Sequence, residues 1–408
     1  MFSGISGNVL MLGLVSLLTD VSSEMIYPLL PLFVTGVLGA GPAFLGVIEG
    51  IAESTAALLK LASGIASDRI RGRKGLVLAG YALSSLSRPL IALAGSPLAV
   101  LAVRFSDRVG KGIRTSPRDA LIADSTAPLQ QGKAFGFHRS LDHVGAIIGP
   151  LSAFVLMAWF VTDMRTVFWL AALPGVLAVA LIVFKVRDMP HEVPAGTGAA
   201  VRMAPAGNIR GFLLILLLFT LGNSSDAFLL LRAGQLGVTP ARIPLLWTFF
   251  HVVKMSSAMP FGTLSDRIGR RGVIVAGWAV YALAYAGFAL AASEVHIWLL
   301  FAWYGLFYGM TEGVEKAYMS DLAAPAERGN AFGWYNFAVG IGALPASLLF
   351  GVIWQKGSPQ AAFGFGAGLA CLAALLLLAW APRAVRRPPQ PLTPKLNRCE
   401  QLLKNDRL

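Results

Sequence analysis

This sequence has few charged residues and few cysteines. Only 13% of its 408 residues are charged, whereas 56% are hydrophobic. A water-soluble globular chain does not reach that balance, so a soluble enzyme is excluded. Two cysteines, Cys371 in an apolar run and Cys399 in a polar tail, provide neither a disulfide framework nor paired zinc ligands. A secreted, disulfide-stapled domain is therefore excluded as well.

Long apolar runs fill most of the chain, and we count twelve of them between residues 9 and 381. A helix that spans a bilayer needs about 20 apolar residues, so twelve spans use roughly 250 residues and leave short connections. Several runs contain Gly, Pro and charge, which the membrane interior tolerates only where they face other helices or a water-filled cavity. The sequence predicts an all-α membrane protein with twelve transmembrane helices, a pattern typical of a transporter.

The charge that is present is unevenly placed. Lys and Arg number 34 against 21 Asp and Glu, which gives a formal charge of +13. Most basic residues fall in alternate loops and in the tail, and the positive-inside rule makes these segments and both termini cytoplasmic. Because the positive charge flanks hydrophobic spans and no nucleic-acid-binding module is present, the expected partner is the lipid bilayer and not a nucleic acid.

An internal repeat divides the chain into two halves. The segment Gly64–Arg69 matches the segment Gly262–Arg267 at an offset of 198 residues, and a stretch that begins at Asp124 matches one that begins at Asp321 at 197. A repeat of this length predicts two pseudo-symmetric six-helix bundles. The expected divisions are an N-terminal bundle over 1–187, a cytoplasmic linker over 188–208, a C-terminal bundle over 209–381 and a disordered cytoplasmic tail over 382–408.

The repeated loops resemble the signature loop of the major facilitator superfamily. The loop after the eighth run reads Gly-x-x-x-Asp-Arg-Ile-Gly-Arg-Arg from Gly262, and its copy from Gly64 has one additional residue before the second glycine. The resemblance covers residues 9–381 and implies a cytoplasmic gate. An Asp at a helix end can accept hydrogen bonds from a neighbouring helix N-terminus and pair with Arg, which makes a contact that can break. The alternative, that the loops only mark topology, explains the Arg residues but not the Asp residues. The implied gating residues are Asp68, Arg69, Arg73, Asp266, Arg267 and Arg270.

The fourth run, over 97–120, carries a stripe of charge. At about 100° per residue its charged side chains fall within an arc of roughly 140°, and such a stripe cannot face lipid. In the family, an arginine in the pattern Arg-x-x-x-Gly-x-Gly on this span takes part in proton coupling or substrate binding. Two assignments stay open, because Arg108 precedes Gly112 by four residues whereas the distance from the signature loop favours Arg104. We expect Arg104 to face the cavity. The stripe consists of Arg104, Asp107, Arg108, Lys111, Arg114, Arg118 and Asp119.

The fifth run contains Gly145-x-x-x-Gly149-Pro150, which resembles the span-5 antiporter motif of drug–proton exchangers. Small residues at this spacing allow close helix packing, and a proline bends the helix. The glycine pair that usually continues the motif is replaced by Ala and Phe. His138 and Asp142 share a face with the two glycines, so we expect both to lie at the cavity.

Four further carboxylates occupy the first two spans, namely Asp20, Glu24, Glu49 and Glu53. A low-dielectric cavity disfavours the charged form of a carboxyl group, which lets such a group load and release a proton. The alternative is that Glu49, Glu53 and Lys60 form structural ion pairs with the arginines of the fourth run. The sequence leaves both interpretations open.

These features favour a secondary active transporter of the plasma (inner) membrane, proton-coupled and monomeric, that moves a small solute by alternating access. The partial span-5 motif favours efflux of a drug-like or amphipathic compound. The cationic side chains alternatively suit an organic anion, a siderophore-like chelate or a metal ion, although no compact metal-ligand spacing is present. No protease, hydrolase or phosphate-binding motif occurs, so neither an enzyme, a cofactor nor an ATP-driven pump is expected. A receptor or scaffold would not need charges buried in both halves.

Overall fold

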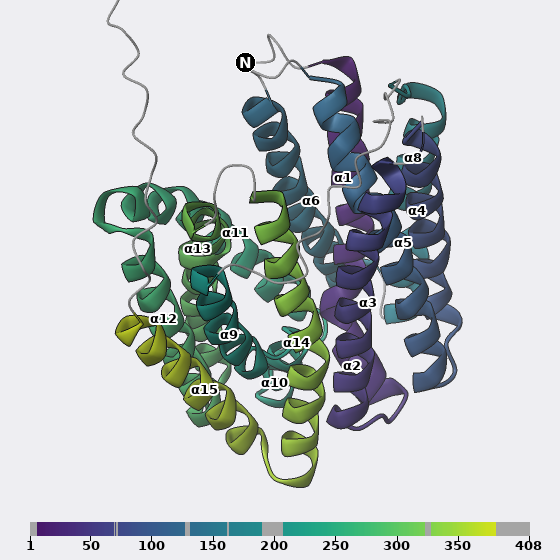
Figure 1. The fold of residues 1–408 in the computed structure, drawn as a ribbon. Coiled ribbons are helices and arrows are strands. Elements are labelled where there is room, and N and C mark those ends of the chain that lie inside the picture. Colours follow the sequence, from purple (N-terminus) through teal and green to yellow (C-terminus); the bar gives the residue numbers. More distant parts are fainter. Residues whose placement is uncertain are drawn as a thin grey trace, which may run out of the picture.

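The computed structural model describes residues 6–68, 70, 72–126, 131–160, 163–189, 207–322 and 328–380, and every regular element in these ranges is helical. The first set of helices is built from the segments before residue 190 (Figure 1). They are α1 (Gly7–Ile26), η1 (Tyr27–Leu29), α2 (Leu30–Leu32), η2 (Phe33–Val37), α3 (Pro42–Asp68), α4 (Lys74–Ser87), η3 (Arg88–Leu93), α5 (Pro97–Asp124), α6 (Gln131–Trp159), α7 (Met164–Leu170) and α8 (Ala172–Lys185).

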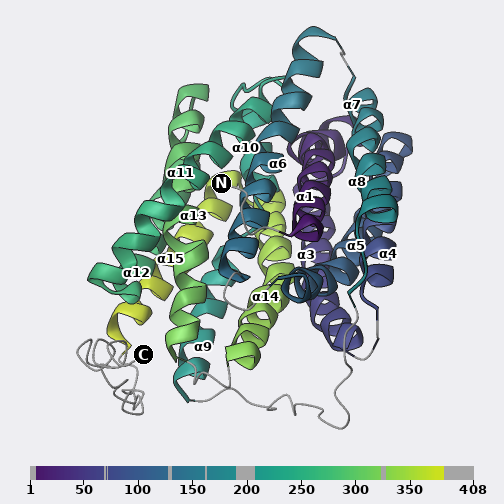
Figure 2. The same cartoon turned by 90° about the horizontal axis from the view of Figure 1, so that it is seen from above.

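The second set begins at residue 207, and its helices lie beside the first set (Figures 1 and 2). They are α9 (Gly207–Gly222), α10 (Ala227–Gln235), α11 (Ile243–Ile268), α12 (Arg270–Leu290), α13 (Glu294–Leu322), α14 (Arg328–Lys356) and α15 (Pro359–Ala379).

Nine helical segments among the described residues are long and apolar enough to cross a bilayer. The three other long helices, α5, α11 and α13, carry charged side chains. Several of those charges lie inside the protein: Arg104 and Asp107 of α5 and Glu315 of α13 are all less than a tenth exposed. Charges on such a helix can be tolerated because they face partners and not hydrocarbon.

The two sets repeat one pattern of helix packing. In the first set α1 packs on α6 and α8, whereas α4 and α3 pack on α5; in the second set α9 packs on α14 and α15, whereas α12 and α11 pack on α13. The contacts between the sets, α3 with α14 and α6 with α11, are counterparts of each other as well. The packing therefore follows the repeat found in the sequence.

The two sets meet closely at one end of the α3–α14 contact. A Cβ atom added to Gly46 would lie 2.3 Å from the carbonyl oxygen of Ser347, so the helix backbones touch there. The backbone N–H of Ala43 donates to Oε1 of Gln355 at 3.1 Å. Beyond Ala57 the helices separate around a hollow of about 350 Å³. The boundary between the sets is thus closed at the Ala43 end and open at the other.

Candidate functional site

A polar cavity lies between the two sets of helices. It consists of two hollows of about 290 and 440 Å³, and both sets contribute to each. Their combined size falls in the range of small-molecule sites, about 300–1,000 Å³. The residues that line both hollows are Tyr27, Glu53, Lys111, Asp226, Lys254 and Tyr308.

Two buried ion pairs lie beside the cavity in the first set; Arg88 and Asp107 line the smaller hollow, whereas Arg104 and Glu49 do not. Nη2 of Arg104 lies 2.8 and 3.0 Å from the two carboxylate oxygens of Glu49. Nε of Arg88 donates to Oδ1 of Asp107 at 2.9 Å, and its Nη1 donates to the carbonyl oxygen of Thr19 at 2.9 Å. If either partner of such a pair lost its charge or moved away, the other would remain as an uncompensated buried ion.

Sequence reasoning missed Arg88, although its charge within the apolar run over 75–94 was a usable signal. Asp107 belongs to the charged stripe of the fourth run, whose spacing indicates no partner for it on another helix. The structure places its carboxylate 2.9 Å from Nε of Arg88, outside that helix, and 3.9 Å from Nη1 of Arg104 within it.

The two candidate arginines of α5 occupy different places. Arg108 lines the cavity, and its Nη2 lies 3.2 Å from Oε1 of Glu53. Arg104 is one turn away, bound to Glu49, with its guanidinium 5.6 Å from the ring centre of Tyr27. The structure therefore puts Arg108 on the cavity wall and Arg104 behind it.

The remaining predicted carboxylates of the first set are held loosely or by neutral donors. Among the described residues, the carboxylate of Asp20 has neither a hydrogen-bond donor nor an ion pair, and it lines the cavity. For Asp142, the nearest basic nitrogens are Nδ1 of His138 at 3.6 Å and Nη1 of Arg139 at 3.7 Å, and its Oδ1 is buried without a hydrogen bond. Glu24 accepts from the indole N–H of Trp247 at 2.8 Å. His138 is buried and does not line the cavity, whereas Asp142 does.

Polar contacts bridge the two sets across the cavity. Glu312 of α13 pairs with Arg139 of α6, and it also accepts from Nζ of Lys254 at 2.8 Å. On the other side, the hydroxyl of Ser225 donates to Oε2 of Glu49 at 3.4 Å. The Arg139–Glu312 and Ser225–Glu49 contacts join parts of the molecule that the repeat places in different halves, whereas Lys254 belongs to the same half as Glu312.

The glycines of α6 pack against α1. A Cβ atom at Gly145 would lie 2.6 Å from the carbonyl oxygen of Leu17, and one at Gly149 would lie 2.7 Å from that of Val21. Pro150 follows within the same helix. The close approach places Asp20 and Asp142 on adjoining faces of the two helices.

The expected gating residues are only partly described. The side chain of Asp68 and the whole of Arg69 lie outside the described residues. Nη1 of Arg73 lies 2.7 Å from Asp124, and Nε of Arg270 lies 2.7 Å from Asp321. An offset of 197 residues relates Arg73 to Arg270 and Asp124 to Asp321, so the additional residue in the first loop precedes Arg73 and leaves its correspondence with Arg270 intact.

The carboxylate of Asp266 lies 3.4 Å from Nη2 of Arg270, so the loop after α11 carries a second contact to the same arginine. Arg267 is exposed. The signature loop of the second half thus brings Asp266, Arg270 and the end of α13 together.

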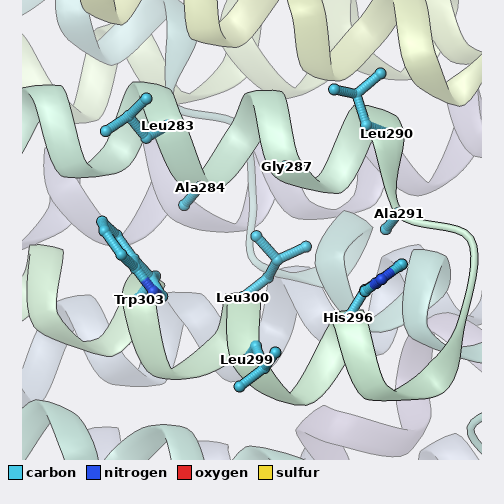
Figure 3. Close-up of a pocket in the computed structure, with 9 residues that line it drawn as sticks. All are labelled: Leu283, Ala284, Gly287, Leu290, Ala291, His296, Leu299, Leu300 and Trp303. Carbon is cyan, nitrogen blue, oxygen red and sulfur yellow. The ribbon is translucent and has the colours of Figure 1, made fainter.

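A second hollow, between α12 and α13, differs from the cavity in chemistry. Figure 3 shows that leucine, alanine and tryptophan side chains line it, and His296 is the one ionisable residue among them. Leu283, Leu290 and Leu299 are each at least 60% exposed. Exposed apolar side chains on a membrane-crossing helix suit contact with lipid.

The described residues also contain no group of three or more metal-ligating side chains.

Comparison with known proteins places the chain in a family. The model of the Major Facilitator Superfamily matches residues 12–231 and 211–405. An MFS-type transporter of Methanocaldococcus jannaschii is 37% identical over 381 residues, which are 92% of this chain and 95% of that one. Multidrug resistance protein MdtH of Aeromonas hydrophila is 22% identical over 342 residues, or 82% and 84% of the two chains.

Solved structures show the same fold. A POT family transporter in complex with 5-aminolevulinic acid matches with a TM-score of 0.78 at 12% identity, over 92% of this chain and 96% of that one. Nucleoside transporter NupG (D323A mutant) matches with a TM-score of 0.77 at 13% identity, over 91% and 99%. The family model and the archaeal relative each span most of the chain. The protein therefore belongs to the Major Facilitator Superfamily, as a multi-pass membrane transporter and not an enzyme.

Proposed function

We propose that the protein is a proton-coupled secondary transporter that moves a small amphipathic solute by alternating access. In this proposal α5, α11 and α13 join the nine apolar segments to make twelve membrane spans in two six-helix bundles, over 1–187 and 209–381. The segments over 188–208 and 382–408 are then a linker and a tail, and both lie in the cytoplasm with the two termini. The placement of basic residues in alternate loops supports this orientation.

The packing between the bundles supports alternating access. The bundles touch at the Ala43 end of the α3–α14 contact and separate beyond Ala57, at the end that the basic loops mark as cytoplasmic. This geometry supports a carrier whose cavity faces the cytoplasm. Rocking of one bundle against the other around the cavity would expose it to the opposite side.

The observation that carries proton coupling is the pair of loosely held carboxylates. Asp20 lines the cavity without a partner among the described residues, and Asp142 has no cationic nitrogen closer than 3.6 Å. Because neither carboxylate is the tight counter-ion of a buried arginine, each can gain and lose a proton without stranding a charge. Glu49 and Asp107 lack that freedom because they are held at 2.8 and 2.9 Å.

The cavity wall supports an amphipathic solute. Tyr27, Trp247, Phe250 and Tyr308 lie among the charges and give an apolar part of the solute a surface to contact. Similarity to a multidrug resistance protein and the glycine motif of α6 favour export from the cytoplasm, in a monomer of the plasma (inner) membrane. A metal ion is a weaker candidate, because the described residues contain no cluster of three or more ligating side chains.

The gating residues belong to the same proposal. Asp266 and Arg270 lie at the cytoplasmic end of α11 and α12, where contact with the other bundle would close the cavity from that side. Asp68, Arg69, Arg73 and Arg267 are proposed for the same role on the strength of the repeat. Asp266→Asn should slow transport strongly while leaving the thermal midpoint nearly unchanged. Normal turnover in that variant would exclude the gate.

The whole proposal is tested with the purified protein in liposomes that hold a pH gradient. A set of amphipathic dyes of different charge is added, and the internal pH and the dye concentration are followed together. At least one dye should move in step with protons. Proton flow that is unaffected by every dye, with dye fluxes that ignore the gradient, would contradict coupled transport.

A further inference from the structure

Most of the cationic side chains at the cavity are bound to an acidic group. Arg88 pairs with Asp107, Arg108 with Glu53, and Arg139 and Lys254 both pair with Glu312. Arg114 donates to the hydroxyl of Ser84 at 2.6 Å and lies over the ring of Tyr81. Two cations are left: Lys60 and Lys111 have no carboxylate within 4.0 Å among the described residues.

These two lysines face the same space. Lys111 lines both hollows of the cavity, and Lys60 lines the larger one and the adjoining hollow toward the open end. The charges that act on Lys111 are those of Arg108, Glu53, Lys60 and Asp20. Glu53 is already the counter-ion of Arg108, and Asp20 and Asp226, which also line the cavity, lie beyond ion-pair distance of both lysines. Among the described residues, neither ammonium group therefore has a paired carboxylate.

The opposite wall adds neutral hydrogen-bonding groups and rings. Asn223, Ser225 and Asn336 come from the second set of helices and line the larger hollow. The rings of Tyr27 and Tyr308 border it as well. A site with uncompensated ammonium groups, neutral donors and an aromatic edge is suited to a compact anion attached to an apolar body.

We propose that Lys60 and Lys111 form a subsite for the anionic group, a carboxylate or a phosphate, of the transported solute. The inference rests on the proposed transport function and names the class of its cargo. The anion lies between the two ammonium groups, and the apolar part of the solute lies against Tyr27 and Tyr308. The hollow of about 440 Å³ admits a solute of this kind.

The subsite predicts that the empty carrier resists closing. Closure of the cavity around Lys60 and Lys111 removes water from two ammonium groups that have no carboxylate within ion-pair distance among the described residues, and burial of unpaired charge is costly. A bound anion supplies the missing counter-charge. The loaded cavity therefore closes more readily than the empty one.

The test uses three compounds of nearly the same shape, namely benzoate, benzamide and benzamidinium, with phenylphosphonate as the phosphate-like arm. Binding to the purified full-length protein is measured by calorimetry and by the shift of its thermal midpoint. Benzoate or phenylphosphonate should bind at least about tenfold more tightly than benzamide, and benzamidinium more weakly still. The comparison of the two anions tells which head group is preferred.

The variants assign the preference to the two lysines. In the Lys60→Gln/Lys111→Gln protein the preference for the anion should shrink to within about twofold, whereas Lys60→Arg/Lys111→Arg should retain part of it. Lys356→Gln, at the exposed end of α14, is the matched control and should bind as the unmodified protein does. The midpoint without ligand shows whether each variant is folded.

The outcomes separate this inference from the proposed function. An anion that binds no better than benzamide, or a preference that survives in the double glutamine variant, would overturn the subsite even if dyes drive protons through the membrane. Anion binding that depends on the lysines, in a protein that moves no protons, would leave the subsite standing and remove coupled transport.

Discussion

The two halves of the molecule share one pattern of helix packing and differ in the chemistry at equivalent positions. An offset of 197 residues aligns α4 and α5 with α12 and α13. Arg88 and Asp107 of the first half, an ion pair at 2.9 Å, correspond to Tyr285 and Tyr304, whose ring centres lie 6.2 Å apart. Lys111 corresponds in the same way to Tyr308.

This comparison teaches that packing and electrostatics are separable in this fold. The second half fills its α12–α13 contact with rings, such as Tyr281 of α12 against Phe307 of α13, with ring centres 4.9 Å apart. Aromatic contacts of this kind hold helices together without desolvating a charge. The first half retains buried ions at the same places, where they are weak evidence for stability. We infer that the first half retains these buried ions because they shape the polar cavity. On this interpretation the second half, packed with rings, is the more rigid of the two.

The largest expected effect comes from breaking the ion pair that the second half does without. Arg88→Met leaves the carboxylate of Asp107 buried without its partner and should cost about 3–5 kcal/mol of stability. Tyr285→Phe, at the equivalent position, removes an uncharged hydroxyl that lies 3.1 Å from that of Ser224 and should cost about 1 kcal/mol. The thermal midpoints of the two variants in one detergent measure the difference.

The double variant Arg88→Met/Asp107→Leu is the control for this prediction. Replacement of both charges by apolar groups should recover most of the lost stability, because no ion is then left unpaired. Equal losses of stability in Arg88→Met and Tyr285→Phe would contradict this prediction. They would show that the cost comes from changing any side chain at this position and not from leaving a buried charge unpaired.

The next effect concerns coupling and separates carboxylates of the two halves. One pH unit is worth about 1.4 kcal/mol, so a single coupled proton supports about tenfold accumulation of solute. Asp142→Asn should remove this accumulation and leave downhill exchange intact. Asp226→Asn should keep it, because Asp226 is held by the hydroxyls of Tyr304 and Tyr308. Unchanged uphill transport in Asp142→Asn would exclude its role as a proton carrier.

The features of the fold that depend only on the spacing of residues could be predicted from the sequence. The repeat at 197–198 residues already indicated two equivalent halves, and the fold repeats its helix contacts accordingly. The Gly145 and Gly149 spacing indicated a close helix contact, although not that α1 is the partner.

The identity of ion-pair partners did not follow from the sequence, because it depends on how neighbouring helices are rotated. Arg88 and Asp107 lie on different helices, and no periodicity connects them. The choice between Arg104 and Arg108 has the same origin. One turn of α5 decides which of them reaches the cavity and which reaches Glu49, and a turn is within the error of a helix phase read from a single sequence.

A smaller effect on stability is expected at equivalent glycines of α6 and α14. A Cβ atom at Gly145 would lie 2.6 Å from a backbone oxygen of α1, whereas one at its counterpart Gly342 would lie 2.8 Å from the side-chain methyl of Thr220. Because a backbone yields less than a methyl group, Gly145→Ala should cost about 1–3 kcal/mol and Gly342→Ala less. Gly136→Ala, with open space around it, should be neutral or stabilising by about 0.5–1 kcal/mol. A Gly145→Ala protein as stable as Gly136→Ala would contradict the close contact.

The smallest effect separates two ion pairs that the repeat makes equivalent. The side chains of Arg73 and Asp124 are 5% and 24% exposed, whereas those of Arg270 and Asp321 are 27% and 43% exposed. Water screens the second pair more strongly, so Arg270→Gln should cost no more than about 0.5 kcal/mol and Arg73→Gln about 1–2 kcal/mol. Added salt should widen the gap in thermal midpoint slightly, because it weakens the exposed Arg270 pair and hardly affects the more buried Arg73 pair. Equal midpoints for the two variants would mean that the first loop is no more tightly fixed than the second.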